Sequence, residues 1–194
     1  MEDYWSRGYL PHHHVPDQSV FITWRLADSL PTGFFEAWKS RPEHLREKNN
    51  AYRTIDIELD KGIGSCALAN HGAALRVSNA IIETHRKTAD VYSFVVMPNH
   101  VHLLCKLNEN TALPEYVRSI KGKTAREINV LLGKSGKLWQ PDYFDRTIRN
   151  EEHFRNVSKY IEWNPARAGL VVSPSEYPFS TANEVIRKKL ASQV

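Results

Sequence analysis

The stretch Val95-Val96-Met97-Pro98-Asn99-His100-Val101-His102-Leu103-Leu104 decides how this chain folds. It is an apolar run typical of a buried strand, interrupted by a Pro-Asn pair that favours a turn. Side chains of a strand alternate between its faces, so His100 and His102 point to the same side. Two imidazoles on one face of a rigid strand can hold a single metal ion. Two partly buried histidines without a metal would give the same pattern, so the site needs support from elsewhere in the chain.

The segments around this stretch predict a β-hairpin inside a domain of mixed helices and strands. Residues 90–97 and 100–107 are expected to be two strands joined at the Pro-Asn turn, and the alternating residues 19–26 predict an earlier strand. Residues 66–87 and 111–132 carry apolar side chains at helical spacing, which predicts two amphipathic helices. A helix and strand alternation of this kind favours an α+β fold.

The second half of the chain predicts one short strand and a capped helix. Residues 138–144 are aromatic and are expected to contain the strand. Asn150 precedes two acidic residues, which together favour the start of a helix. This helix is expected to run to about Asn164, with Pro165 stopping or restarting it. A last short helix is expected over 183–189, and residues 1–17 are expected to be irregular.

Composition describes an ordinary globular protein rather than a membrane or disulfide-rich one. The 194 residues, with 41% hydrophobic and 25% charged, predict a single domain over 1–194 with a charged helical insertion at about 34–61. The two cysteines form no Cys-x-x-Cys pattern, so neither a zinc ribbon nor a disulfide framework is expected, and the default compartment is the cytoplasm. No membrane association is expected, because no apolar run approaches the about 20 residues that span a bilayer. No P-loop is present, so no nucleotide cofactor is expected.

A tyrosine and an asparagine on a predicted helix could complete the site. Tyr160 and Asn164 are four residues apart and therefore share one helix face. A tyrosine hydroxyl can attack phosphorus, and an amide oxygen could be a third ligand of the metal held by His100 and His102. Nitrogen and oxygen ligands with water suit Mg²⁺ or Mn²⁺. Tyr160 could equally be an ordinary half-buried helix tyrosine.

Three blocks of sequence resemble a known group of DNA-processing enzymes. Residues 95–104 resemble the His-hydrophobic-His motif of the HUH single-strand nucleases. Residues 139–149 and 160–170, together with the helix segment 121–129, resemble the REP-associated tyrosine transposases, relatives of the single-tyrosine transposases of small insertion sequences. The blocks occur in the family's order, and the resemblance covers roughly residues 20–179.

The resemblance implies a fold, a reaction and a set of site residues. It implies a ferredoxin-like antiparallel sheet flanked by helices, the HUH endonuclease fold, with the histidines on a central strand. His100 and His102 match the metal-binding histidines, Tyr160 matches the nucleophile, and Asn164 stands where the family has a Gln or Asn that completes the metal site. The implied activity is metal-dependent cleavage and rejoining of single-stranded DNA at repeated palindromic hairpins, through a covalent 5′-phosphotyrosine. The charged segment 41–61 lengthens the first connection and is not expected to touch the matched blocks.

The net charge of +4 agrees with an anionic partner such as single-stranded or hairpin DNA. Cations that follow phosphates are expected near the tyrosine helix and along the exposed face of the helix 111–132. The candidates are Arg146 and Arg149, then Arg118, Lys121, Lys123 and Arg126. Basic residues at such density also occur on helix faces that meet only solvent.

Two other functions fit parts of the pattern. The first is a domesticated relative that binds hairpin DNA without cutting it; binding alone would need neither the histidines nor the tyrosine. The second is a different metalloenzyme, such as a hydrolase that uses His100, His102 and a carboxylate such as Asp145, and that does not need Tyr160.

Overall fold

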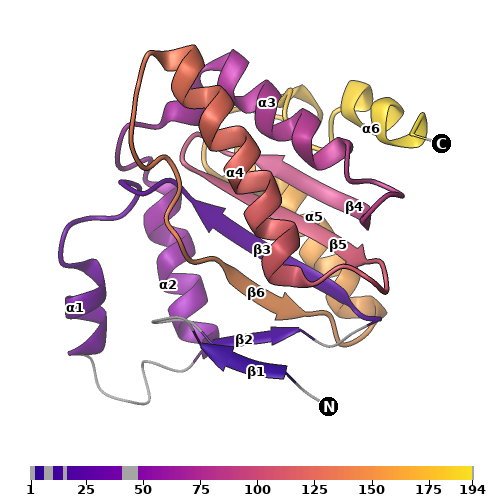
Figure 1. Ribbon diagram of the computed structural model, residues 1–194, viewed down its shortest axis with the longest axis horizontal. Helices are drawn as coiled ribbons and strands as arrows, with labels where there is room; N and C mark the ends of the chain where they lie inside the picture. Colours follow the sequence, from indigo (N-terminus) through magenta and orange to yellow (C-terminus); the bar gives the residue numbers. More distant parts are fainter. Residues whose placement is uncertain (1–2, 7–10, 15–16, 41–47, 194) are drawn as a thin grey trace.

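A four-stranded antiparallel sheet forms the centre of the molecule (Figure 1). The computed structural model describes residues 3–6, 11–14, 17–40 and 48–193. The sheet has the order β4-β5-β3-β6, so β5 and β3 are central. Its strands are β3 (Ser19–Arg25), β4 (Ala89–Val96), β5 (His100–Leu107) and β6 (Phe144–Thr147). The predicted hairpin is confirmed: β4 and β5 pair antiparallel, and the Met97 amide donates to the carbonyl of His100 across the turn.

Helices α3 (His71–Ile82) and α4 (Leu113–Leu132) cover one face of the sheet (Figure 1). Strand β3 is followed by α3, β4, β5, α4 and β6, which is a βαββαβ order. With the sheet order read from β6, the four strands stand in the sequence 4-1-3-2, and every pair is antiparallel. This is the ferredoxin-like arrangement, and the predicted α+β fold is therefore confirmed.

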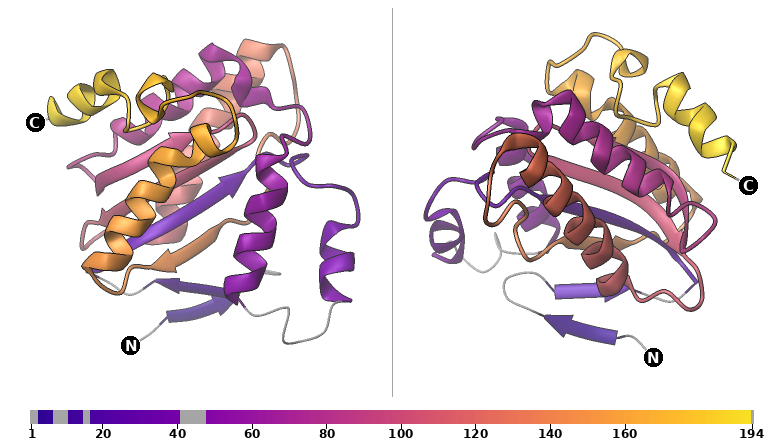
Figure 2. Two further views of the ribbon diagram at one scale, coloured as in Figure 1. Left: turned by 180° about the vertical axis from the view of Figure 1, so that it is seen from behind. Right: turned by 45° about the horizontal axis from the view of Figure 1, so that its top comes forward.

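The opposite face of the sheet carries α5 (Glu151–Arg167) and α2 (Lys48–Asp60), as seen from behind in Figure 2. Alternation along β5 divides its side chains between the two faces. Val101 and Leu103 belong to the large apolar cluster beneath α3 and α4, whereas Leu104 packs with Ile161 of α5 in a second cluster. His100 and His102 have the same parity as Leu104, so both imidazoles face α5 and α2.

The predicted start of α5 is confirmed, whereas its predicted end and the predicted strand before it differ in detail. Asn150 accepts the backbone N–H of His153 at 2.8 Å and starts α5, as predicted. Pro165 does not stop this helix, because it lies in the last turn, where its missing N–H removes only one backbone hydrogen bond. The aromatic segment 138–144 makes only an isolated bridge at Trp139, and the strand itself begins at Phe144.

Shorter elements surround this framework: α1 (Phe34–Lys39), the 3-10 turns η2 (Ala67–Ala69) and η3 (Pro174–Glu176), and α6 (Glu184–Ala191). The predicted irregular N-terminus is wrong in part, because β1 (Asp3–Ser6) and β2 (Pro11–His14) pair antiparallel. Part of the predicted insertion, residues 41–47, lies outside the described residues. No helix in the described part of the chain has both the length and the apolar character needed to cross a bilayer.

Candidate active site

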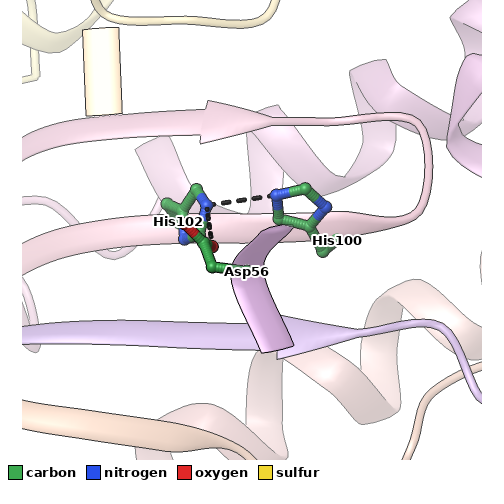
Figure 3. Close-up of side chains that lie close together, drawn as sticks. All are labelled: Asp56, His100 and His102. Atoms are coloured by element: carbon green, nitrogen blue, oxygen red, sulfur yellow. Dashed lines mark hydrogen bonds and ion pairs between the residues drawn. The ribbon is translucent and has the colours of Figure 1, made fainter. Parts of the chain in front are cut away.

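Two histidines of β5 and one aspartate of α2 bring their ligand atoms together (Figure 3). The Nε2 atoms of His100 and His102 are 3.1 Å apart. Oδ1 of Asp56, from α2, lies 3.3 Å from Nε2 of His102. All three side chains are buried, and their ligand atoms lie within 4.8 Å of one another. A buried group of two imidazoles and one carboxylate could bind a metal ion.

Hydrogen bonds at the opposite ring nitrogens hold both imidazoles in place. Nδ1 of His100 is 2.7 Å from Oδ1 of Asn99, and Nδ1 of His102 is 2.8 Å from Oγ1 of Thr23. Burial, and then the neighbouring His102, hold the pKa of His100 well below its usual range. His100 is therefore neutral near pH 7, as a metal ligand must be. Partners of this kind fix the tautomer and orientation of a ligating histidine.

The predicted tyrosine helix brings Tyr160 against the histidines of the same chain. The ring centroids of Tyr160 and His102 are 5.5 Å apart, and the ring of Phe21 contacts Tyr160 edge-on at 6.2 Å. Nδ2 of Asn164 donates to the hydroxyl of Tyr160 at 3.3 Å. The guanidinium carbon of Arg167 is 5.1 Å from the tyrosine ring centroid. The two halves of the predicted site thus lie side by side.

Three buried oxygens around this cluster have no hydrogen-bond donor among the described residues. They are Oδ1 of Asn164, Oδ1 of Asp56 and Oδ1 of Asp60. A buried acceptor without a donor destabilises the fold by about 1–3 kcal/mol, and native proteins leave few such atoms. A cation bound by the two Nε2 atoms would satisfy Oδ1 of Asp56, and its positive charge would act on the other two oxygens. The residues present therefore fit a divalent metal ion.

Asp60 lies one helical turn after Asp56 on α2 and adds a further negative group. Burial, and then the negative charge of Asp56, raise the pKa of Asp60 to about 6, although His102 and Arg167 act in the opposite direction. At neutral pH the Asp60 carboxyl is therefore mostly ionised. The site combines two carboxyl groups, Asp56 and Asp60, with the imidazoles of His100 and His102, which favours a cation.

The sequence did not point to Asp56. The charged segment was expected to be exposed and to avoid the matched blocks, but α2 brings Asp56 into contact with His102, and only 7% of Asp56 is exposed. The carboxylate considered instead, Asp145, pairs with Ile22 in the register of β3 and β6. Ile22 belongs to the cluster on the α3 and α4 face, so Asp145 points away from the histidines.

The predicted DNA-contacting cations divide between the two faces of the sheet. Arg146 stands opposite Phe21 on β6, on the same face as Tyr160, and Arg149 is exposed just before α5. Three cations on α4 are also exposed but lie across the sheet from the histidines: Arg118, Lys123 and Arg126. Arg146 thus shares a sheet face with Tyr160, whereas the three α4 cations do not.

Lys121 differs from the exposed position expected for it. It is 9% exposed, and its ammonium donates to the carbonyls of Gln140 and Pro141 at 2.7 Å each and to that of Asp142 at 3.3 Å. Burial lowers the pKa of Lys121 to about 8, with Asp142 acting in the opposite direction. Its ammonium thus joins α4 to the segment before β6.

Replacement of Lys121 by Met is expected to lower the free energy of unfolding by about 1–3 kcal/mol, because three carbonyls lose their donor. Urea unfolding followed by circular dichroism measures this. Lys123→Met is the matched control, since Lys123 lies on the same helix and makes one exposed contact, with Glu83. Equal stability of the two variants would contradict a structural role for Lys121.

Comparison with known proteins places the chain in a family. The family model described as "Transposase IS200 like" matches residues 68–164, half of the chain. A REP-associated tyrosine transposase of Escherichia coli strain K12 is 29% identical over 114 residues, which cover 58% of this chain and 66% of that protein. The ISDra2 transposase TnpA of Deinococcus radiodurans is 35% identical over 79 residues, which cover 38% of this chain and 56% of that protein. The chain therefore spans slightly less than two thirds of the first relative and just over half of the second.

A solved structure described as "Structure of the REP associates tyrosine transposase bound to a REP hairpin" shares the fold. Its TM-score is 0.56 at 22% identity, and the match covers 97% of this chain and 87% of that one. The family match includes the histidine pair, Tyr160 and Asn164, and it begins after Asp56. The sequence blocks, the fold and the family match agree: the chain belongs to the IS200-like transposase family, and REP-associated tyrosine transposases are among its relatives.

Proposed function

We propose that this protein is a metal-dependent single-strand DNA endonuclease and strand transferase that cleaves and rejoins DNA through Tyr160. The observation that carries the proposal is the contact between Tyr160 and His102 in one chain, with Asn164 donating to the tyrosine hydroxyl. A nucleophile held beside a candidate metal site suits an in-line attack on phosphorus. A protein that only binds DNA has no need of this arrangement.

The chain's own residues account for the positioning of the nucleophile. The ring of Tyr160 is held between Phe21 and His102, and the Asn164 amide orients its hydroxyl. The phenolic oxygen forms a bond to the scissile phosphorus, the bond from phosphorus to the 3′ oxygen breaks, and the 3′ oxygen leaves as a hydroxyl while the phenolic proton is released. The positive charge of Arg167 beside the ring stabilises negative charge that develops on the phenolic oxygen.

His100, His102 and Asn164 would hold the divalent ion, Mg²⁺ or Mn²⁺. When bound, such an ion supplies Lewis acidity toward the phosphate. Oδ1 of Asn164 is buried and has no donor among the described residues, which supports this role for the amide. A phosphotyrosine conserves the energy of the phosphodiester, so a 3′-hydroxyl can reverse the reaction without a nucleotide cofactor.

Relatives supply the proposed substrate. The relative from Escherichia coli is named REP-associated, and the solved neighbour is described as bound to a REP hairpin. We therefore propose hairpin DNA with an unpaired flank as the substrate of this chain. Incubation of the protein with an end-labelled hairpin oligonucleotide and Mn²⁺ or Mg²⁺ should give a labelled protein band on a denaturing gel. Tight hairpin binding without an adduct under any divalent ion would favour the non-cleaving alternative.

Replacement of Arg146 and Arg149 by Ala is expected to weaken hairpin binding by about tenfold or more. The slope of log affinity against log salt concentration should fall by an amount that corresponds to up to two phosphate contacts. Arg146 shares the sheet face of Tyr160, and Arg149 is exposed just before the tyrosine helix, on the side where we expect the cleaved strand to pass. Fluorescence anisotropy at several salt concentrations measures the double Ala variant.

The matched comparison is the double variant Arg118→Ala and Arg126→Ala, which removes the same charge from the far face of the sheet. We still predict that Arg118, Arg126 and Lys123 contact the stem of the hairpin. The Arg118→Ala and Arg126→Ala variant is expected to lose less hairpin affinity than the variant without Arg146 and Arg149. A larger loss from the α4 pair would place the main DNA path on α4 instead.

A further inference from the structure

Helix α2 presents one carboxylate to the histidine pair from outside the region that matches the family. Its neighbours show that this is not a charged helix lying free in solvent: Leu59 is 1% exposed and Asp56 is 7% exposed, while Ile57 between them is 52% exposed. Burial of a carboxylate is costly unless a partner compensates it. Nε2 of His102 lies 3.3 Å from Oδ1 of Asp56, and this oxygen has no hydrogen-bond donor in the described part of the chain.

Hydrogen bonding determines which nitrogen of His100 carries its proton. Nδ2 of Asn99 donates to the carbonyls of Leu59 at 3.0 Å and Ile63 at 3.3 Å, which fixes the orientation of the amide. Oδ1 of Asn99 can then only accept, so Nδ1 of His100 is the donor in their 2.7 Å contact. The neutral His100 ring therefore directs the unprotonated Nε2 toward His102.

The separations of the three ligand atoms suit one octahedral ion. Metal–ligand distances of about 2.1 Å place adjacent ligands about 3 Å apart. The observed separations are 3.1 Å between the two Nε2 atoms and 3.3 Å between Nε2 of His102 and Oδ1 of Asp56. When Nε2 of His102 is also unprotonated, as metal ligation requires, the two nitrogens and the carboxylate oxygen direct their lone pairs at one cation.

The same contacts join α2 to the site at a second point. Asn99 connects the carbonyl of Leu59, near the end of α2, to His100 at the start of β5. The turn after α2 is also tight, because a Cβ at Gly64, whose φ is 94°, would collide with the carbonyl of Asp28. These contacts fix the end of α2, the helix that carries Asp56, beside the start of β5.

We propose that Asp56 is a protein ligand of the divalent metal, so that α2 completes a site with two imidazoles and one carboxylate. The proposal rests on the metal site proposed above at His100 and His102, and it adds a negatively charged oxygen ligand to Asn164. Hard divalent ions such as Mg²⁺ and Mn²⁺ prefer such a ligand. A bound metal ion would then hold α2 against β5 through Asp56.

Mn²⁺ binding to the full chain, measured from the electron paramagnetic resonance signal of free Mn²⁺, tests this without reference to cleavage. Asp56→Asn keeps the size of the side chain and is expected to weaken Mn²⁺ binding by about tenfold or more. Glu58→Gln removes the same charge from α2, where Glu58 pairs only with Lys61 in the described structure, and is expected to stay within about twofold of wild type. Asp60→Asn removes the next carboxylate along α2, and it is expected to weaken Mn²⁺ binding less than Asp56→Asn does.

Equal Mn²⁺ affinity of Asp56→Asn and wild type would overturn the proposal, and so would a loss confined to Asp60→Asn. Asp56→Cys is a second test, which does not depend on whether an asparagine at this position can still bind the metal. Because a thiolate is a soft ligand, this variant is expected to bind Mn²⁺ more weakly and Cd²⁺ more tightly than wild type. Its thiolate-to-cadmium absorption should exceed that of wild type. Absence of that absorption would also contradict ligation by this position.

Hydrogen exchange gives a readout in the helix itself. Mn²⁺ is expected to slow amide exchange over residues 53–60 in wild type and Glu58→Gln, but not in Asp56→Asn. If wild type binds no Mn²⁺ at all, the proposed metal site fails as well. If wild type binds Mn²⁺ and Asp56→Asn binds it equally well, only the role of Asp56 fails.

Discussion

Tyr160→Phe is expected to lower formation of the covalent DNA adduct by at least about a thousandfold, because it removes the attacking oxygen and no other hydroxyl takes its place. The ring is retained, so its contacts with Phe21 and His102 remain. The only hydrogen bond lost in the described structure is the one from Asn164. Hairpin affinity and unfolding should therefore stay close to those of wild type.

Tyr177→Phe is the matched control for this variant. Tyr177 packs in the same apolar cluster, and its hydroxyl donates to the carbonyl of Val96 rather than facing the histidines. The labelled band on a denaturing gel should persist in Tyr177→Phe and disappear in Tyr160→Phe. An adduct of wild-type intensity in Tyr160→Phe would refute the assignment of the nucleophile.

His102→Ala is expected to reduce cleavage by about a hundredfold or more while leaving hairpin DNA binding largely intact. The variant removes a proposed ligand and leaves the Thr23 hydroxyl and the Asp56 carboxylate without their contact. Cleavage should fall to the same level when wild type is treated with a chelator. Adduct formation at several Mn²⁺ concentrations separates weaker metal binding from loss of the site.

His71→Ala serves as the control, because His71 is exposed at the start of α3, on the other face of the sheet. Two results would change the account. Unchanged cleavage in His102→Ala would exclude a metal role for the pair. Activity that survives Tyr160→Phe but not His102→Ala would indicate a hydrolase that uses the metal without a tyrosine.

Local sequence signals predicted the elements that carry the site. The apolar alternation of β5, the Pro-Asn turn and the Asn150 cap act within a few residues of the structures they determine. Spacing of four residues correctly placed Tyr160 and Asn164 on one helix face. No local signal shows that β5 and α5 meet; only the resemblance to the family fold implied it, and the ring contact of Tyr160 with His102 agrees with that implication.

Contacts between distant segments were not visible in the sequence. Asp56 stands in a helix whose composition resembles a solvated charged face, and no spacing rule connects it to His102. Lys121 was different, because a signal was present: Val117, Lys121, Thr124 and Ile128 repeat every three or four residues, which is the spacing of a buried stripe. A lysine is usually exposed, so the sequence prediction placed Lys121 on the surface despite this spacing. The backbone carbonyls of residues 140–142 accept hydrogen bonds from its ammonium, which compensates for its burial.

The central claim is that Tyr160 becomes covalently joined to the 5′ phosphate of cleaved DNA. Mass spectrometry of the protease-digested adduct, formed with an unlabelled hairpin and Mn²⁺, tests it most directly. The account predicts one modified peptide, in which Tyr160 carries a 5′-phosphorylated nucleotide. A phosphodiester link at another residue, or cleaved DNA with no link to the protein, would contradict it.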